Sequence, residues 1–532
     1  MISGRIYRAT GLMTAGTALS RATGLLRVAA MTYALGVSAT RLADTYNLAN
    51  TTPNIVYELF LGGIFTAVFV PVLVEIQTAE RGDRSALVTV SLLVLAAVSV
   101  LTAVAAPIVI RIYTFRISDP ATRAAQLSLA TFLLRWFAPQ IFFYGVSAIA
   151  QALLNVRGRF GPPAFAPILN NVVVTAMFFA YARIIAQHGL HLGTNARVVL
   201  GAGTTAGVVL QAVVIVPYLR AERLRFRPRL RDPAVVRVAR LSAFVVGYVV
   251  VNQIGFWVVL ALANGRSGGV AAFTIAFMFF QVPHALFAVS LLTALFPDMS
   301  RAAAEEDWDT YRRWFHSGVR GVVYLLLPAA LGYIILADPM TRLILARGFA
   351  NARDAALVAG VLRGLASGLV FFSAFQLLTR CFYAVQDTRT PTALNAVAVA
   401  VNTAINFPLF AWLGVAGLGY AQSLAYAVGM ALLAWRLARK IPGGLRPRAL
   451  TGPLARIGGL SAVMGLVVWA VVRVHPGGDA ATVAICVGAG AILYLAFSQV
   501  AGVEERELLL VFLRRRPVDA RRGREPGASA GG

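Results

Sequence analysis

Charged residues are scarce in this 532-residue chain. Asp, Glu, Lys and Arg make up 13% of it and hydrophobic residues 58%, whereas soluble proteins carry about 25% charged residues. The polar surface is therefore too small to coat a water-soluble globule, and the mean hydropathy of +0.73 agrees. Lysine is nearly absent, since Lys440 is the only one among 48 basic residues. These shortages predict a polytopic membrane protein.

Cysteine and histidine are also sparse. Cys381 and Cys486 lie in apolar stretches and the five histidines are scattered, which excludes a disulfide framework and a zinc motif. Walker, GxSxG and HExxH patterns do not occur. The acidic run 305–309 is better explained as a solvated loop. We therefore expect no metal, no cofactor and no enzymatic activity, and an ATP-driven pump is disfavoured.

Long hydrophobic runs are abundant, and a helix needs about 20 apolar residues to cross a bilayer. The runs are continuous and rich in Leu, Val and Ala, so they predict helices rather than barrel strands. The predicted fold is an all-α integral membrane protein with about fourteen spans. These are 10–36, 46–74, 86–110, 126–154, 163–183, 198–218, 238–262, 269–296, 315–336, 356–384, 391–411, 414–435, 456–473 and 480–502.

The basic residues that give the chain its net charge of +26 lie mainly in the predicted loops. With the N-terminus in the cytoplasm, most basic residues fall on the cytoplasmic side, as the positive-inside rule requires. An even number of spans then places both termini inside. This charge is explained by topology and by anionic headgroups, so we expect no nucleic-acid partner.

Proline landmarks repeat along the chain and indicate a duplication. Pro71, Pro163 and Pro228 are followed at nearly one spacing by Pro297, Pro391 and Pro447. The pattern predicts an N-lobe over 1–230 with spans 1–6 and a C-lobe over 231–450 with spans 7–12. Spans 13–14 then occupy 451–505, and a basic tail, expected to be disordered, occupies 506–532. Parallel repeats of this kind are typical of transporters.

Ionisable residues inside predicted spans suggest a functional site, because a charge at mid-membrane is costly. Arg27 lies on the order of 25 Å along the first helix and shares a face with Ser20 and Gly24. Arg21 points elsewhere, to a cavity or to a structural partner. Glu58, in the second span, is expected either to neutralise one of these arginines or to bind a coupling cation.

A second polar group occurs late in the chain. Asp387 closes the tenth span, and Asn402, Thr403 and Asn406 follow in the eleventh at near-helical spacing. This group is a candidate cation site, with helix–helix hydrogen bonding as the alternative. Arginines in a low-dielectric cavity suit a lipid-linked diphosphate, although another organic anion would fit the same charge.

Several motifs resemble the MurJ/MviN-type lipid II flippases. Ser20-Arg21-Ala22-Thr23-Gly24-Leu25-Leu26-Arg27 matches the SRxxGxxR start of that family. Further matches are Ala43-Asp44, Pro53-Asn54, Phe69-Val70-Pro71, Leu154-Asn155, Arg159-Phe160, Pro163 to Pro167, Phe382-Tyr383, Gln386-Asp387 and Thr390-Pro391. The family belongs to the multidrug/oligosaccharidyl-lipid/polysaccharide exporter superfamily, whose two six-helix lobes agree with the duplication.

The resemblance implies a flippase that moves undecaprenyl-diphosphate-linked peptidoglycan precursor from the inner to the outer leaflet by alternating access. It implies that the protein lies in the bacterial inner membrane. It also implies that the membrane potential or a Na⁺/H⁺ gradient drives transport. Spans 13–14 would hold the lipid tail. Lipid II and membrane lipids are the expected partners, with cell-wall synthesis proteins as further candidates.

The resemblance carries Arg21, Arg27 and Asp44 into a substrate-binding set, and this chain departs from the family at several positions, including Val28, where many relatives have an acidic residue. Many relatives carry an arginine pair where this chain has Tyr57 and Glu58, and an arginine where it has Met278, so neutral donors are expected to contribute. The set is Arg21, Arg27, Asp44, Asn54, Glu58 and Gln281, with Asp387, Asn402 and Thr403 as the candidate cation site.

Three alternatives remain open from the residues. The first is another exporter of the same superfamily, for lipid-linked oligosaccharides or drugs. The second is a non-transporting scaffold that recruits cell-wall enzymes through the basic tail. The third, a membrane glycosyltransferase or phosphatase, would need a metal-binding or nucleophilic cluster.

Overall fold

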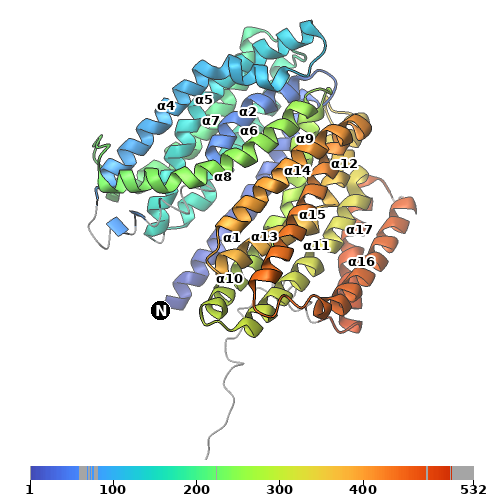
Figure 1. The fold of residues 1–532 in the computed structure, drawn as a ribbon. Helices are drawn as coiled ribbons and strands as arrows, with labels where there is room; N and C mark the ends of the chain where they lie inside the picture. Colours follow the sequence, from blue (N-terminus) through green and yellow to red (C-terminus); the bar gives the residue numbers. More distant parts are fainter. Residues whose placement is uncertain are drawn as a thin grey trace, which may run out of the picture. The chain divides into compact units, whose positions relative to one another are not determined.

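The chain folds into helices throughout its described part (Figure 1). The computed structural model describes residues 2–58, 69, 72–73, 75–76, 82–157, 159–222, 224–474, 477–503 and 505. Within these ranges, 10 helices are long and apolar enough to cross a membrane, or 11 if the broken pair α12 (Ala352–Ala366) and α13 (Leu369–Ala384) is one span. The all-α membrane class is confirmed, and the count of fourteen stays a prediction. The tail 506–532 lies outside the described residues.

Two compact units divide the chain by contact rather than by sequence order. Unit 1 comprises Met1–Val282, Ala337–Gly368 and Arg389–Gly429, and unit 2 comprises the remainder. Unit 1 therefore contains the whole predicted N-lobe and parts of the predicted C-lobe, whereas unit 2 contains the rest of the C-lobe and the segment after it. The predicted boundaries at 230 and 450 stay predictions.

Ten of the described α-helices lie in unit 1, together with parts of α11 (Trp308–Leu345) and α15 (Val415–Lys440). They are α1 (Ile2–Leu35), α2 (Leu42–Glu58), α4 (Arg84–Thr114), α5 (Pro120–Val156), α6 (Gly161–Ala180), α7 (Thr194–Ile215), α8 (Pro233–Ala263), α9 (Gly269–Pro283), α12 (Ala352–Ala366) and α14 (Arg389–Leu413). Figure 1 shows α4, α5 and α7 side by side, with α5 packed against both neighbours.

Helix starts in unit 1 follow simple capping rules. Asp83, Asp119 and Asp232 precede α4, α5 and α8, and each carboxylate accepts a backbone N–H from the first turn. Pro120 and Pro233 occupy the first helical position, where a missing N–H costs nothing. The caps account for sharp helix starts at the ends of long apolar segments.

The middle of α4 presents apolar side chains to its surroundings. Val100, Leu101, Val104 and Ile108 are each more than 60% exposed, which in water would form a large unfavourable apolar surface. Most residues in the apolar stretch of the neighbouring α5 are instead buried inside the protein. This face of α4 is therefore a lipid-facing surface.

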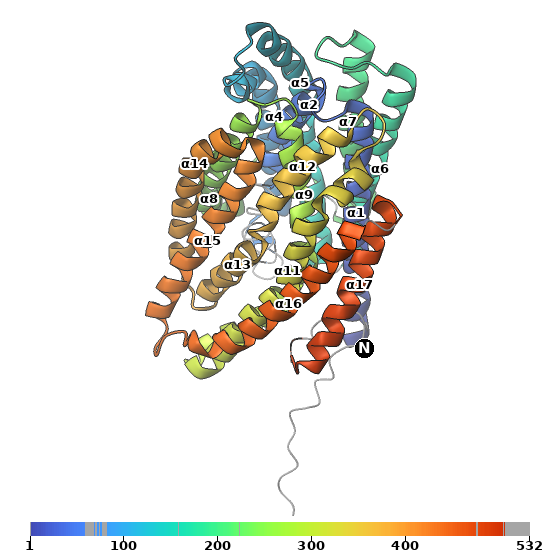
Figure 2. The same ribbon diagram turned by 90° about the vertical axis from the view of Figure 1, so that its right-hand side faces the viewer.

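Five further α-helices of the described residues lie in unit 2. They are α10 (Val289–Ala304), α11 (Trp308–Leu345), α13 (Leu369–Ala384), α16 (Arg448–Val474) and α17 (Asp479–Val500), with the end of α15 (Val415–Lys440). Figure 2 shows α16 and α17 packed along each other. The Tyr494 hydroxyl donates to the carbonyl oxygen of Tyr324 at 2.9 Å and so joins α17 to α11.

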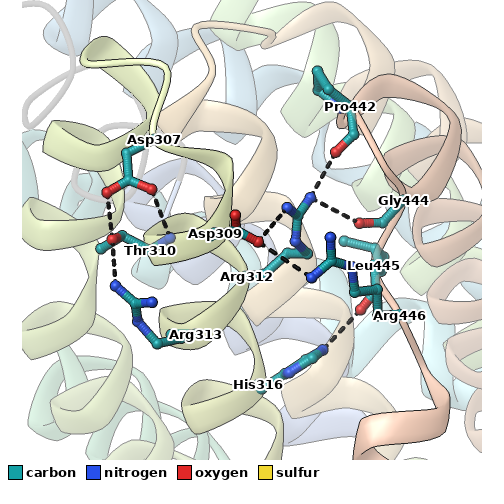
Figure 3. Close-up of polar contacts among 10 residues, drawn as sticks. All are labelled: Asp307, Asp309, Thr310, Arg312, Arg313, His316, Pro442, Gly444, Leu445 and Arg446. Atoms are coloured by element: carbon teal, nitrogen blue, oxygen red, sulfur yellow. Dashed lines mark hydrogen bonds and ion pairs between the residues drawn. The ribbon is translucent and has the colours of Figure 1, made fainter.

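A buried arginine holds the loop between α15 and α16 against the start of α11 (Figure 3). Arg312 donates to the carbonyl oxygen of Pro442 at 2.6 Å and to Oδ1 of Asp309 at 2.6 Å. His316, one turn later, contacts the Leu445 carbonyl oxygen at 2.7 Å. The guanidinium satisfies loop carbonyls that no helix can satisfy, so this loop has a defined path.

Candidate functional site

A polar cavity lies inside unit 1, between α1, α2, α6 and α9. Its volume is about 100 Å³, which holds a few water molecules at roughly 30 Å³ each. Arg27 is the charged member of its described lining. The other lining residues are Val28, Met31, Tyr46, Asn47, Asn50, Thr51, Asn54, Phe178, Thr274, Ile275 and Met278. The cavity therefore combines one guanidinium with a row of amides and hydroxyls.

Helix α2 supplies the row of polar groups. Asn47, Asn50, Thr51 and Asn54 follow an i, i+3, i+4, i+7 pattern, which places them on one helix face. Asn47 Nδ2 and Thr51 Oγ1 bond back to carbonyl oxygens of their own helix at 2.9 and 2.7 Å. Asn50 Oδ1 is buried and has no hydrogen-bond partner among the described residues. This face of α2 can form hydrogen bonds with a polar ligand in the cavity.

Tyr46 fixes the orientation of this face. Its ring packs edge-on against Phe137 and Phe178, and its hydroxyl lies 2.9 Å from Thr204 Oγ1. These contacts tie α2 to α5, α6 and α7 at once. The polar face of α2 is thus held toward the cavity by an aromatic cluster behind it.

Helix α1 forms the opposite wall and approaches α6 and α9 closely. A Cβ at Gly24 would lie 3.0 Å from Cε of Met278, so glycine permits this approach. Asn171 Nδ2 donates to the Ser20 carbonyl oxygen and to Thr23 Oγ1, both at 3.1 Å. Arg27 is therefore held one turn beyond a fixed α1–α6 contact, and Met278 gives the wall an apolar thioether.

The predicted substrate-binding residues separate in the structure. Arg27 and Asn54 line the cavity together. Arg21 and Gln281 are half-buried on α1 and α9 and are not part of its lining. The side chain of Glu58 lies outside the described part of the chain.

Asp44 is fully buried and binds the start of α9. Its two carboxylate oxygens accept the backbone N–H groups of Gly268 at 2.7 Å and Ala271 at 2.9 Å. A carboxylate at a helix N-terminus satisfies orphan donors and interacts favourably with the helix dipole. Asp44 thus acts as a cap for a helix far away in sequence.

The turns before α2 and α9 are joined by further hydrogen bonds. Arg41 Nη1 donates to the Asn264 carbonyl oxygen at 2.8 Å, and Ser267 Oγ donates to the Ser38 carbonyl oxygen at 2.5 Å. Gly268 has a positive φ, and a Cβ there would lie 2.7 Å from Ser38 Cα, so only glycine fits. We call the set Ser38, Arg41, Asp44, Asn264, Ser267 and Gly268 the latch.

Asp354 reinforces the latch from α12. It accepts the backbone N–H groups of Ser38 at 3.0 Å and Val37 at 3.3 Å, and it also accepts the Ser38 hydroxyl. Asn351 and Asp354 form a capping box at the start of α12, which orients this carboxylate. Two buried carboxylates from different helices therefore hold adjacent turns at one end of unit 1.

Two of the three candidate cation residues, Asp387 and Asn402, have protein partners at a side-chain oxygen. Lys440 Nζ lies 2.9 Å from Oδ2 of Asp387 within unit 2, so an ammonium group already neutralises this carboxylate. Asn402 lies in unit 1, where its Oδ1 accepts from Asn406 Nδ2 at 2.9 Å, and Thr403 is half-buried beside it. The described residues contain no group of three His, Cys, Asp or Glu side chains that could hold a metal ion.

Two parts of this arrangement were missed from the sequence. The α2 face could have been found, because its i, i+3, i+4, i+7 spacing is visible along 47–54. Asp354 carries a weaker signal, the Asn351–Asp354 capping-box spacing. That signal predicts a helix start and gives no indication that the same carboxylate also binds the turn before α2.

Comparisons with known proteins agree with this architecture. The family model described as "Lipid II flippase MurJ" matches residues 31–487. A probable lipid II flippase MurJ of Vibrio cholerae is 27% identical, over 95% of this chain and 98% of that protein.

Solved structures are similar in fold. A lipid II flippase MurJ in an inward closed conformation superposes with a TM-score of 0.77 at 21% identity, covering 94% of this chain and 99% of the other. An inward-facing MATE-family multidrug resistance transporter of the MOP superfamily reaches a TM-score of 0.63 at 14% identity, covering 82% and 95%. With the family model matching most of its length, this chain belongs to the lipid II flippase MurJ family.

Proposed function

We propose that this chain moves lipid II, the undecaprenyl-diphosphate-linked peptidoglycan precursor, from the inner to the outer leaflet. The observation that carries the proposal is Arg27, the charged residue in the described lining of the cavity, in a chain of this family. Guanidinium binds phosphate oxygens through two parallel N–H donors, and a cavity shielded from water strengthens the attraction. Transport proceeds without a covalent step.

Neutral groups complete the diphosphate site in this proposal. The Asn47, Asn50 and Asn54 amides and the Thr51 and Thr274 hydroxyls can donate to phosphate oxygens, and all five line the cavity. These donors compensate for the apolar side chain of Met278 on the opposite wall, which cannot bind phosphate. We assign Arg27 and Asn54 to direct contact, and Arg21, Glu58 and Gln281 to the path by which the headgroup enters.

The cavity must enlarge before the headgroup can enter. Its volume of about 100 Å³ is below the roughly 300–1,000 Å³ of small-molecule sites, and a disaccharide-peptide headgroup is larger than most small molecules. In this proposal the described arrangement of unit 1 is a closed one. Opening toward the latch requires Asp44 and Asp354 to release five backbone or hydroxyl donors, which makes the latch the barrier to exposure on that side.

The setting of this transport is part of the same proposal. The chain lies in the bacterial inner membrane with both termini in the cytoplasm, and the basic loops support this orientation. Membrane potential or a Na⁺/H⁺ gradient drives the cycle. Because Lys440 pairs with Asp387, a coupling cation at this carboxylate would have to displace a lysine. Membrane lipids and cell-wall synthesis proteins are the remaining proposed partners.

The proposal is tested by a lipid II translocation assay on purified protein in liposomes. Arg27→Ala should lower the translocation rate by about 10- to 100-fold, the value of a hydrogen bond to a charged group. Arg27→Lys should be intermediate, because an ammonium keeps the charge and loses the bidentate geometry.

Arg111→Ala is the matched control. Arg111 is an exposed arginine in the last turn of α4, away from the cavity, so its loss should leave the rate unchanged. A wild-type rate in Arg27→Ala liposomes would refute the role of the cavity. Failure of the wild-type protein to move lipid II, with another lipid-linked sugar or a drug moved instead, would refute the substrate.

A further inference from the structure

An apolar groove lies on the outside of unit 1, and its lining shares no residue with that of the cavity. It has a volume of about 380 Å³, within the range of small-molecule sites. Its walls come from α4, α5 and the connector 216–232 that leads from α7 to α8. The lining includes Val88, Leu92, Val146, Ile149, Val216 and Leu219. Arg220, also in the lining, is exposed and gives the groove a cationic rim.

The connector is fixed in place, so the groove is preformed. The backbone N–H of Arg225 donates to Ser85 Oγ at 3.2 Å, and the backbone N–H of Arg227 donates to Thr89 Oγ1 at 3.0 Å. Arg227 Nη1 also binds Asp83 Oδ2 at 2.9 Å. The first two turns of α4 therefore hold the connector along one side of the groove.

The carboxylates beside the groove are already neutralised. Glu222, with 2% of its side chain exposed, binds Arg84 at 2.5 Å and also binds Arg157. Asp83 binds Arg227. Among the residues that the structure describes, no carboxylate forms an ion pair with Arg220. The rim therefore carries positive charge that an external anion can neutralise.

Apolar side chains of the connector are exposed next to these cations. Phe226 is 75% exposed, Leu230 69% and Tyr218 48%, and Arg225, Arg229 and Arg231 are exposed between and beside them. A segment that alternates cations with exposed aromatic and aliphatic side chains is typical of contact with an anionic membrane surface. The predicted orientation places this connector at the cytoplasmic leaflet, which holds anionic lipids.

We propose that the groove binds an anionic glycerophospholipid, with one acyl chain between α4, α5 and the connector and the phosphate on Arg220. The apolar groove with its cationic rim matches a molecule that has one charged end and one apolar tail. The groove suits a fatty acyl chain better than the several-fold longer polyprenyl tail of the transported substrate. The site is separate from Arg27 and does not depend on the proposed transport function.

The test measures lipid binding to the full-length protein in detergent by native mass spectrometry. Phosphatidylglycerol and phosphatidylcholine with identical acyl chains are titrated separately, and undecaprenyl phosphate is added as a competitor. Wild type should retain phosphatidylglycerol in preference to phosphatidylcholine. Arg220→Gln should weaken phosphatidylglycerol binding by about fivefold, the value of one cation near an anionic lipid surface. Arg111→Gln, which changes an exposed arginine at the other end of α4, should not.

A second pair of variants tests the apolar walls of the groove. Val216→Trp should fill the groove and reduce retention of both phospholipids, whereas Val213→Trp changes a similarly exposed α7 residue outside the lining and should have no effect. Equal binding of the two phospholipids by wild type, or equal behaviour of Arg220→Gln and Arg111→Gln, overturns the proposal. Displacement of phosphatidylglycerol by undecaprenyl phosphate at equal concentration also overturns it, since the groove would then hold a polyprenyl tail.

Discussion

Replacing Asp44 by asparagine should open the latch. The carboxylate accepts two backbone N–H groups at the start of α9, and an amide can accept only one while its NH₂ group faces the other donor. Loss of one charge-assisted hydrogen bond costs about 1.5–3 kcal/mol, and the lost helix-dipole interaction adds to this. A change of about 2–3 kcal/mol shifts the closed-to-open equilibrium by about 30- to 150-fold.

Thiol accessibility reports this equilibrium directly. A Thr51→Cys substitution puts a thiol in the cavity wall, and the native Cys381 and Cys486 are buried. The modification rate by a membrane-impermeant maleimide, added to intact cells, is compared with and without Asp44→Asn. The rate should rise by at least tenfold in the Asp44→Asn background, because the reagent reaches the cavity only while the latch is open.

An exposed cysteine controls for changes in reagent access and protein level. Ala121→Cys, in the first turn of α5, is exposed in the closed structure, so its modification rate should not change with Asp44→Asn. If the Thr51→Cys rate also stays the same, the contacts of Asp44 with α9 do not hold this end closed, and the latch explanation is wrong.

Two further predictions concern loops outside the membrane and are checked by thermal denaturation. Arg312→Met should lower unfolding free energy by about 2–3 kcal/mol, because buried carbonyls lose a charged donor, whereas Arg446→Gln, at a site 61% exposed, should change it by less than about 1 kcal/mol. Asp83→Ala should cost about 1 kcal/mol at neutral pH through loss of the α4 cap. Burial raises the pKa of Asp83, but the hydrogen bonds from Arg227 and the Ser85 backbone outweigh burial, so the pKa lies below its ordinary 3.8. The Asp83 contribution is thus present above the unfolded-state pKa of about 3.9 and lost as pH falls through the folded value, so an Asp83→Ala deficit that persists in acid would contradict this explanation.

The all-α membrane class followed from the sequence because it depends on local composition. A run of apolar residues long enough to span hydrocarbon must satisfy its backbone internally, and a helix does this within the segment. The family was identified from motifs for a similar reason, since the residues around Arg21, Arg27 and Asp44 keep their spacing along the chain. Both inferences needed only neighbours in sequence.

The cavity was partly predictable. The face shared by Ser20, Gly24 and Arg27 indicated which side of α1 meets other helices, and Arg27 and Asn54 do line the cavity. Arg21 was selected by charge and motif and Gln281 as a neutral donor, yet both lie outside its lining. Helical periodicity gives the angle of a side chain around its own helix, and it does not specify which helix stands opposite.

Sequence by itself thus determined the helical class, the family and the candidate arginine of the cavity, because each rests on composition or short-range spacing. Only the tertiary structure decided that Asp44 caps α9, that Asp354 binds the turn before α2, and that Lys440 neutralises Asp387. These partners lie tens to hundreds of residues apart. A buried carboxylate must find a donor, and packing alone determines which donor is within reach.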